Sequence, residues 1–145
     1  MQTFLPDKSF RKSAQILDNK RLGKQRIEAR QILEILVEER LEFMTLSKSR
    51  WRNHPAVRLW EHKEKALSLY GVEMCLEWKA RGYKDNQLFI FCREYYRFHT
   101  DKPDPYPDFS EALYSSHRAA LFAKNPEYYK QFGWREKPVI DYVWR

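Results

Sequence analysis

The sequence predicts an all-α protein, a compact single-domain helical fold over residues 1–145 with one long helix near the N-terminus. Apolar residues recur every three or four positions over most of the chain, and the alternation typical of strands is weak. Only 4 of the 145 residues are glycine, which also disfavours a sheet protein with many tight turns. A chain of this length is enough to enclose one core.

The first two helices are predicted between residues 6 and 44. Pro6 and Asp7 start a short helix that runs toward Leu17. Asp18 follows as the expected N-cap of a long helix over residues 19–44. Its apolar residues fall at helical spacing, and they are Leu22, Ala29, Ile32, Leu33 and Leu36.

The middle of the chain predicts a basic loop followed by one more long helix. The loop covers residues 47–53. Pro55 fits the first turn of a helix that continues to Ala80 and stops at Gly82. The expected buried side of this helix carries Trp60, Leu67, Met74 and Trp78.

The last part of the chain predicts three helices, a proline-rich loop and an extended tail. These elements are a helix over residues 86–99 capped by Asp85, a loop over 101–107, a helix over 110–124, a short helix over 126–132 ended by Gly133, and a tail over 138–145 with Tyr142 and Trp144. No internal repeat and no domain linker interrupts this order.

Composition excludes several classes of protein. No run approaches 18 apolar residues, so we expect no membrane span and no membrane partner. The first residues lack the basic and apolar regions of a signal peptide. Two cysteines, Cys75 and Cys92, cannot form a disulfide scaffold, and the expected location is the cytoplasm.

The charge of the chain is positive and unevenly distributed. The net charge is +7, and aromatic residues make up 16% of the chain. Residues 8–30 hold eight Lys or Arg and two acidic residues, whereas residues 31–46 hold four Glu and one Arg. Segregated charge favours a polyanion lying across the first half of the long helix. Aromatic side chains would suit extruded bases, but an aromatic core under a basic surface explains the composition equally well.

One carboxylate lies among the cations of the predicted phosphate-binding face. Arg21, Lys24, Glu28 and Gln31 are spaced three, four and three apart, so they form one stripe on a helix. The ordinary interpretation is that Lys24 and Glu28 form an exposed ion pair worth a few tenths of a kcal/mol. The functional interpretation is that a carboxylate there would repel DNA unless it does chemistry or binds a metal.

A metal or cofactor site is not expected. The four histidines, His54, His62, His99 and His117, share no ligand spacing, and the two cysteines are far apart. The chain also lacks a nucleophile elbow, a phosphate-binding glycine loop and a dinucleotide fingerprint.

Two further segments could contact nucleic acid. Trp51, Arg52 and His54 precede a predicted helix N-terminus, where a phosphate could bind, although Asn53 could equally be the N-cap. Residues 126–134 combine aromatic side chains with a cation. Core packing explains about half of these aromatic residues, and the others could stack on bases or wedge into a duplex.

Three segments, in the same order, resemble the pyrimidine-dimer DNA glycosylases of the phage endonuclease V type. Residues 17–28 resemble the helix that carries the family's catalytic glutamate, and residues 54–83 are similar to its middle helix. Residues 116–133 resemble its C-terminal basic helix and aromatic motif. The resemblance covers most of the chain and implies a single all-α DNA glycosylase-like domain over residues 1–145.

The resemblance also implies a mechanism. The N-terminal amine attacks C1′ of the damaged nucleotide and expels the base, and the resulting imine allows β-elimination to cut the strand. Glu28 takes the position of the glutamate that stabilises the cationic sugar. The residues implied to bind phosphate are Arg21, Lys24, Arg26, His117, Arg118 and Lys130. From the aromatic motif, Tyr128, Tyr129 and Trp134 are candidates for DNA contact.

The nucleophile differs from that of the phage enzyme, in which a threonine becomes the first residue. Gln2 is large enough to block removal of the initiator, so the amine of Met1 is the expected nucleophile. An α-amine is far less basic than a lysine, so much of it is a free nucleophile at neutral pH. Phe4 and Leu5 are expected to pack into the core and hold the terminus near Glu28.

The sequence therefore predicts a monomeric DNA-repair glycosylase with AP-lyase activity that acts on damaged double-stranded DNA, with a pyrimidine dimer as the expected lesion. Two alternatives stay open. One is a non-catalytic DNA-binding module of the same fold. The other is a glycosylase for another modified base, because the shape of the pocket decides which lesion is accepted.

Overall fold

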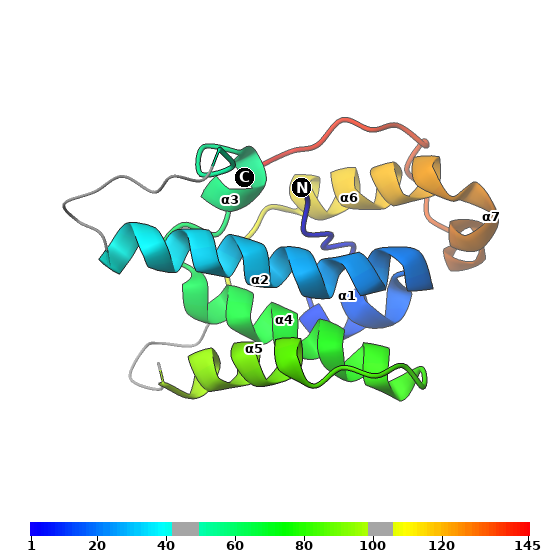
Figure 1. The fold of residues 1–145 in the computed structure, drawn as a ribbon. Helices are drawn as coiled ribbons and strands as arrows, with labels where there is room; N and C mark the ends of the chain where they lie inside the picture. Colours follow the sequence, from blue (N-terminus) through cyan, green and yellow to red (C-terminus); the bar gives the residue numbers. More distant parts are fainter. Residues whose placement is uncertain (42–49, 99–105) are drawn as a thin grey trace.

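Helix α2, Asn19–Leu41, runs through the middle of the molecule, and the other elements pack around it (Figure 1). The computed structural model describes residues 1–41, 50–98 and 106–145, with the side chains of residues 39–41 left out. The remaining helices are α1 Phe10–Ile16, α3 Pro55–Arg58, α4 Glu64–Ala80, α5 Gln87–Phe98, α6 Glu111–Lys124 and α7 Pro126–Tyr129, followed by a 3₁₀ turn, η1 Lys130–Phe132. Since the described residues include no strand, the predicted all-α class is confirmed.

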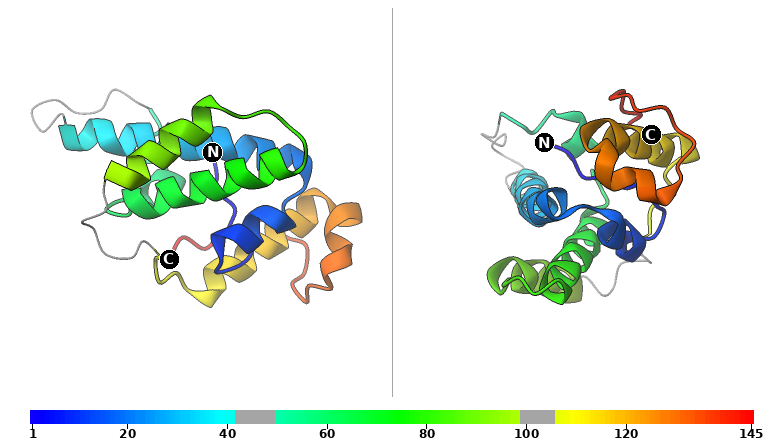
Figure 2. Two further views of the ribbon diagram at one scale, coloured as in Figure 1. Left: turned by 90° about the horizontal axis from the view of Figure 1, so that it is seen from below. Right: turned by 90° about the vertical axis from the view of Figure 1, so that its right-hand side faces the viewer.

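The helices form two groups on opposite sides of α2. Viewed nearly along α2, helices α4 and α5 lie on one side, and α6 and α7 lie on the other (Figure 2, right). The N-terminal segment, coloured dark blue, runs between α2 and α6 before it reaches α1. This segment therefore lies in the interior of the fold.

Large apolar side chains from all parts of the chain form one core. Leu22 and Leu33 of α2 and Met74 of α4 are fully buried, as the helical spacing predicts. The rings of Trp60 and Tyr70 each lie within about 6 Å of Phe10. Aromatic burial of this kind supplies much of the free energy of folding in a small domain.

The predicted first helix is shorter than expected. It begins at Phe10 and not at Pro6, because the Ser9 side chain accepts a hydrogen bond from the Lys12 backbone N–H and caps α1. Asp7 in turn accepts a hydrogen bond from the Ser9 N–H at 2.8 Å. Asp7 therefore stabilises the turn before the helix.

The single helix predicted from Pro55 to Ala80 is wrong, because α3 ends at Arg58 and α4 begins at Glu64. His62, between them, has a left-handed backbone with φ of 62°. A left-handed residue ends a right-handed helix. No glycine or proline marks this break, so it could not be predicted from local sequence.

The remaining predicted elements agree with the structure where it describes them. Helix α6 is capped by Ser110, and η1 ends at Gly133, which has a φ of 63°. The tail over residues 138–145 has no helix or strand and returns across α6 toward α3 (Figure 1). The predicted ends at Met44 and His99, residues 47–49 of the basic loop and residues 101–105 of the proline-rich loop lie outside the described residues. No helix in the described ranges is long and apolar enough to cross a membrane.

Candidate active site

Four consecutive backbone N–H groups of the N-terminal segment, those of residues 2–5, each donate a hydrogen bond to a side chain. The Gln2 N–H donates to Glu28 Oε2 at 3.3 Å, and the Thr3 N–H donates to the side chain of Gln2 at 2.8 Å. The Phe4 N–H donates to Gln25 at 2.7 Å. The Leu5 N–H donates to His117 Nδ1 at 2.8 Å. Buried backbone groups need such partners, so this path of the chain is well specified.

Two core residues add further contacts to this segment. Trp60 Nε1 donates to the Thr3 hydroxyl at 2.8 Å, and the Tyr70 hydroxyl lies 2.8 Å from the Phe4 carbonyl. Phe4 and Leu5 are buried, as expected. Met1 directly precedes Gln2, whose N–H donates to the Glu28 carboxylate, so the first residue lies close to that carboxylate.

Glu28 is oriented by two donors. Its Oε2 accepts the Gln2 N–H and also the Gln25 side-chain amide at 3.2 Å. Gln25 is itself fixed, because its Oε1 lies 2.7 Å from the Tyr70 hydroxyl. Burial and the nearby charge of Glu28 raise the pKa of Tyr70 well above its ordinary value, so the phenol keeps its proton. Glu28 therefore belongs to a network that reaches the core.

The structure disagrees with the interpretation of Glu28 as a surface ion-pair partner. Among the described residues, no ion pair joins Lys24 to Glu28. Lys24 is exposed, whereas Glu28 is half-buried and its carboxylate turns toward the N-terminal segment. The two side chains instead line the same hollow.

This hollow, which we call the cationic cavity, has a volume of about 400 Å³. Its lining residues are Met1, Gln2, Phe4, Lys20, Arg21, Lys24, Gln25, Glu28, Lys124 and Tyr142. Four of them are cations, and Glu28 is the carboxylate in this lining. The size is that of a site for a small group such as one nucleotide unit.

The cationic cavity brings together four of the predicted site residues, Met1, Arg21, Lys24 and Glu28. Arg21 also donates to Asp18 at 3.1 Å. The sequence interpretation missed Gln25 and three other lining residues, Lys20, Lys124 and Tyr142. Lys20 and Gln25 lie within residues 17–28, the segment that resembles the family's glutamate-bearing helix. Lys124 and Tyr142 are brought to the cavity by the tertiary fold, so no local sequence pattern predicts them.

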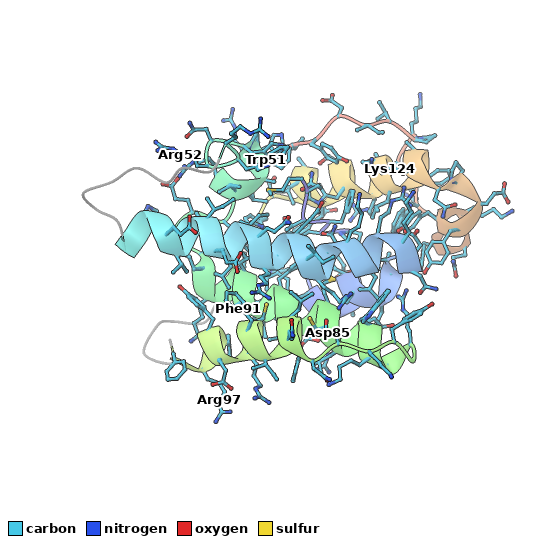
Figure 3. All side chains as sticks on the ribbon, in the orientation of Figure 1. Trp51, Arg52, Asp85, Phe91, Arg97 and Lys124 are labelled. Carbon is cyan, nitrogen blue, oxygen red and sulfur yellow. The ribbon has the colours of Figure 1, made fainter. Side chains whose placement is uncertain are left out.

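A second group of predicted residues lies beside the terminus. His54 Nδ1 accepts a hydrogen bond from the Ala56 N–H at 3.1 Å, so His54, and not Asn53, is the N-cap of α3. Burial and then the nearby terminal ammonium lower the pKa of His54. The His54 ring also contacts Trp51, with ring centroids 5.5 Å apart. Arg52, half-buried on the same loop, is labelled beside Trp51 in Figure 3.

His117, which the resemblance implies to bind phosphate, lies in the interior of this structure. The side chain is fully buried, and its Nδ1 accepts the Leu5 N–H. Burial lowers the pKa of His117 to about 3, so the ring is neutral at physiological pH. It acts as an anchor for the N-terminal segment.

Arg26 and Arg118 have protein partners that compete with phosphate. Arg26 is paired with Asp85 and lies 4.4 Å from the centre of the Trp78 ring, away from the cationic cavity. Arg118 is paired with Glu111 and Glu136. Its Nη1 also donates to the Pro6 carbonyl at 3.0 Å. In this conformation, both guanidinium groups bind protein partners from other parts of the fold.

The aromatic motif contacts Leu17 and Asp18, the two residues before α2, so packing accounts for part of it. Tyr129 is fully buried, and its hydroxyl donates to Asp18 at 2.5 Å. Trp134 stacks on Tyr129 with ring centroids 5.5 Å apart. Tyr128 is half-buried with its hydroxyl 3.4 Å from the Leu17 carbonyl. Lys130 is exposed and pairs with Glu127 at 3.0 Å, so it stays accessible at the surface.

The described residues contain no group of three or more His, Cys, Asp or Glu side chains that could hold a metal ion. The groups that line the cationic cavity can take part in chemistry of their own. These include an amine, a carboxylate and several cations, which together suit a reaction on a polyanion with a nucleophile and a proton acceptor.

An all-helical fold with an amine and a carboxylate in a cationic cavity suits an enzyme that acts on nucleic acid. Residues 1–91 match the family model described as pyrimidine dimer DNA glycosylase, and the chain belongs to this family. The match covers α1 to α4 and the first part of α5. It identifies a DNA-repair glycosylase with DNA as its substrate. No curated protein and no solved structure was found to match the chain.

Proposed function

We propose that this glycosylase excises a damaged pyrimidine, with a pyrimidine dimer as the lesion, and then cuts the strand as an AP lyase. The amine of Met1 is the nucleophile. The observation that carries this proposal is the hydrogen bond from the Gln2 N–H to Glu28, because it places the first residue of the chain beside a fixed carboxylate.

The first step replaces the bond between C1′ and the base. The nitrogen of Met1, in its free amine form, forms a bond to C1′, and the base leaves with the electron pair of the glycosidic bond and takes up a proton. The C1′–O4′ bond of the sugar then breaks, O4′ takes up a proton as the amine nitrogen loses one, and an iminium forms between the Met1 nitrogen and C1′. The α-amine is suited to this step because it is less basic than a lysine side chain.

The second step cuts the strand. The iminium withdraws electrons, so a base removes a proton from C2′ and the bond from C3′ to the phosphate oxygen breaks. Glu28 assists this proton transfer and stabilises the cationic sugar before it. The network of Gln25 and the Gln2 N–H supports this role because it fixes the carboxylate without neutralising it.

The cations of the cavity position the strand. Lys20, Lys24 and Lys124 are exposed, and all three line the cavity that contains Met1 and Glu28. Contacts from such lysines to phosphates fix the register of the backbone and do not read sequence. A single protein chain acting as a monomer on duplex DNA is part of this proposal.

Blocking the terminal amine tests the proposed function. Two duplexes are prepared, one with a thymine dimer and one with an abasic site, and each is incubated with free or N-terminally acetylated protein. Acetylation should abolish cleavage of both duplexes while the dissociation constant for DNA stays within about threefold, since one charge is lost. Cleavage by the acetylated protein at the rate of the free protein would overturn the proposed nucleophile.

A further inference from the structure

The C-terminal tail, residues 138–145, crosses α6 and is fixed to it at two points. The Val143 N–H donates to Ser116 Oγ at 3.0 Å. The Ser110 hydroxyl, which caps α6, also donates to the Arg145 carbonyl. Figure 1 shows this tail in red as it returns across α6 toward α3. The tail therefore has a defined path, although it contains no helix or strand.

Two aromatic side chains of the tail turn inward. Tyr142 and Trp144 are half-buried and pack against the core, whereas Val143 between them is exposed. Side chains two residues apart lie on the same face of an extended segment. The centroids of the two rings are 5.5 Å apart. The tail thus presents a pair of adjacent rings to the interior of the fold.

The Tyr142 ring packs against the N-terminal segment and against the residue that anchors it. Its centroid lies 6.3 Å from that of Phe4 and 5.8 Å from that of His117. His117 in turn accepts the Leu5 N–H at 2.8 Å. The tail therefore covers a part of the chain whose backbone is already held by side chains of the core.

The hydroxyl of Tyr142 lies at the cationic cavity. Tyr142 lines this cavity together with Met1 and Gln2. Burial raises the pKa of the Tyr142 hydroxyl, whereas the charge of Arg21 and the side-chain amide of Gln2 lower it, so both groups lie near the phenol oxygen. A residue of the tail is thus a neighbour of the first two residues of the chain.

Trp144 contacts His54, which also lies beside the terminal amine. The centroids of the two rings are 6.2 Å apart, with the rings nearly perpendicular. Burial lowers the pKa of His54, and the terminal ammonium lies close enough to lower it further. Through Tyr142 and Trp144, the tail therefore contacts the surroundings of Met1 at two places.

A nucleophile at the end of a chain needs contacts of this kind. The first residues of a protein are usually poorly ordered unless other elements hold them. An attacking atom has to stay about 3–3.5 Å from the carbon it attacks, in one orientation. Contacts that fix the start of this chain therefore affect the reaction as well as the fold.

We infer that the C-terminal tail positions the amine of Met1 for its attack on C1′, with Tyr142 and Trp144 as the positioning residues. This inference rests on the proposed function, because it assigns the tail a role relative to the Met1 nucleophile. Neither ring takes part in a proton transfer or in the bond changes. Loss of a ring should therefore slow the reaction of bound DNA and leave the affinity for DNA unchanged.

Tyr142→Ala tests this role, with Tyr142→Phe as the conservative variant. Single-turnover cleavage of abasic duplex at saturating protein should be at least fivefold slower for Tyr142→Ala, while the dissociation constant stays within twofold of the wild type. Tyr142→Phe keeps the ring on Phe4 and should cleave within twofold of the wild type. Ile140→Ala is the matched control, because Ile140 belongs to the same tail, is 54% exposed and does not line the cationic cavity.

Hydrogen exchange in the absence of DNA tests the hold on the N-terminal segment independently of any activity. The N–H groups of residues 3–5 should exchange at least fivefold faster in Tyr142→Ala than in the wild type. Ile140→Ala should show the exchange of the wild type. If Tyr142→Ala does not fold, Trp144→Ala decides by the same two measurements.

Cleavage by Tyr142→Ala at the wild-type rate, or unchanged exchange of residues 3–5, would overturn the inference. Weaker affinity with an unchanged rate at saturation would assign Tyr142 to phosphate binding, and the inference would be wrong. If the wild type cuts no duplex while the exchange responds as expected, the proposed function fails. The tail then only stabilises the N-terminal segment, and the positioning role falls with the proposed function.

Discussion

The Glu28 carboxylate is surrounded by hydrogen-bond donors and by the cations of the cavity. A glutamate on a helix face four residues from a lysine is usually a solvated ion-pair partner. Here its carboxylate accepts hydrogen bonds from Gln25 and from the N-terminal segment, and it lines a cavity with four cations. A sequence stripe gives the face of the helix, but it cannot show which neighbour a carboxylate turns to. That depends on where residues 1–5 lie.

Glu28→Gln should remove at least 99% of the strand cleavage and leave the fold intact. The amide is nearly isosteric and can still accept from the Gln2 N–H, but it cannot take a proton or stabilise a cationic sugar. Affinity for DNA should stay equal or rise, because a negative charge leaves the phosphate-binding surface. Single-turnover cleavage of abasic duplex and a binding isotherm measure the two effects.

Glu73→Gln is the matched control for this variant. Glu73 of α4 pairs with Arg11 at 3.4 Å and lies outside the cationic cavity. It should cleave at the rate of the wild type. If Glu28→Gln also cleaves at that rate, Glu28 has no role in the reaction.

His117 links pH to stability. The unfolded histidine titrates near pH 6.5, whereas burial lowers the pKa of the folded one to about 3. The unfolded chain therefore binds one more proton between these two pH values, and stability falls as the pH drops from about 6.5 to about 3. The contribution of this group is about 1.4 kcal/mol per pH unit within that window.

His117→Asn should make the pH dependence of unfolding shallower by about that amount. The asparagine oxygen can accept the Leu5 N–H in place of Nδ1, but it does not titrate. Urea unfolding at several pH values between 4 and 7 gives the slope for each protein. Identical slopes for the variant and the wild type would mean that His117 is not buried as a neutral ring.

At the scale of elements, the sequence predicted the helices better than the connections between them. Helical periodicity and capping residues such as Ser110 gave α6 its bounds, because these signals are local. The break between α3 and α4 has no local signal and follows from the left-handed His62 and the burial of Trp60. Tertiary packing, which a single sequence does not display, decides such breaks.

In the candidate site, likewise, residues on one helix could be predicted from the sequence, whereas residues from other elements could not. The α2 members Arg21, Lys24 and Glu28 could be predicted because they share one helix face. Lys124 and Tyr142 could not, because they come from the end of α6 and from the tail. The sequence also could not show which aromatic residues of the motif pack in the core, as Tyr129 does, since an aromatic motif has the same sequence pattern in a core and at an interface.

Tyr129→Phe should destabilise the start of α2. The Tyr129 hydroxyl accepts the Asp18 N–H at 3.1 Å and donates to the Asp18 carboxylate, and both groups are buried. Losing it should lower the free energy of unfolding by about 1–3 kcal/mol. Affinity for damaged and undamaged duplex should fall by the same factor. A selective loss for damaged DNA would restore the aromatic motif as a recognition element.

At the scale of the whole molecule, part of the positive charge of this +7 chain lines the cationic cavity, where it can contact DNA. Lys20, Lys24 and Lys124 come from two helices and line one cavity. Each phosphate contact makes the logarithm of the binding constant fall by about 0.9 per tenfold rise in salt. Three such contacts predict a slope of about −2.7 or steeper.

Lys24→Ala should reduce the magnitude of this slope by about 0.9, and Arg97→Ala should leave it unchanged. Arg97 lies on α5, on the far side of α2 from Lys124 (Figure 3). Binding isotherms between about 50 and 200 mM salt measure the slopes. A flat salt dependence in the wild type would contradict phosphate binding by the cationic cavity.

Trapping the covalent intermediate shows which nitrogen of the protein is the nucleophile. Borohydride reduces an iminium between the protein and abasic DNA to a stable amine, and peptide mass spectrometry then locates the linked nitrogen. The adduct should lie on the α-amine of Met1. An adduct on Lys24 or any other side chain would contradict the assignment of the terminal amine as the nucleophile.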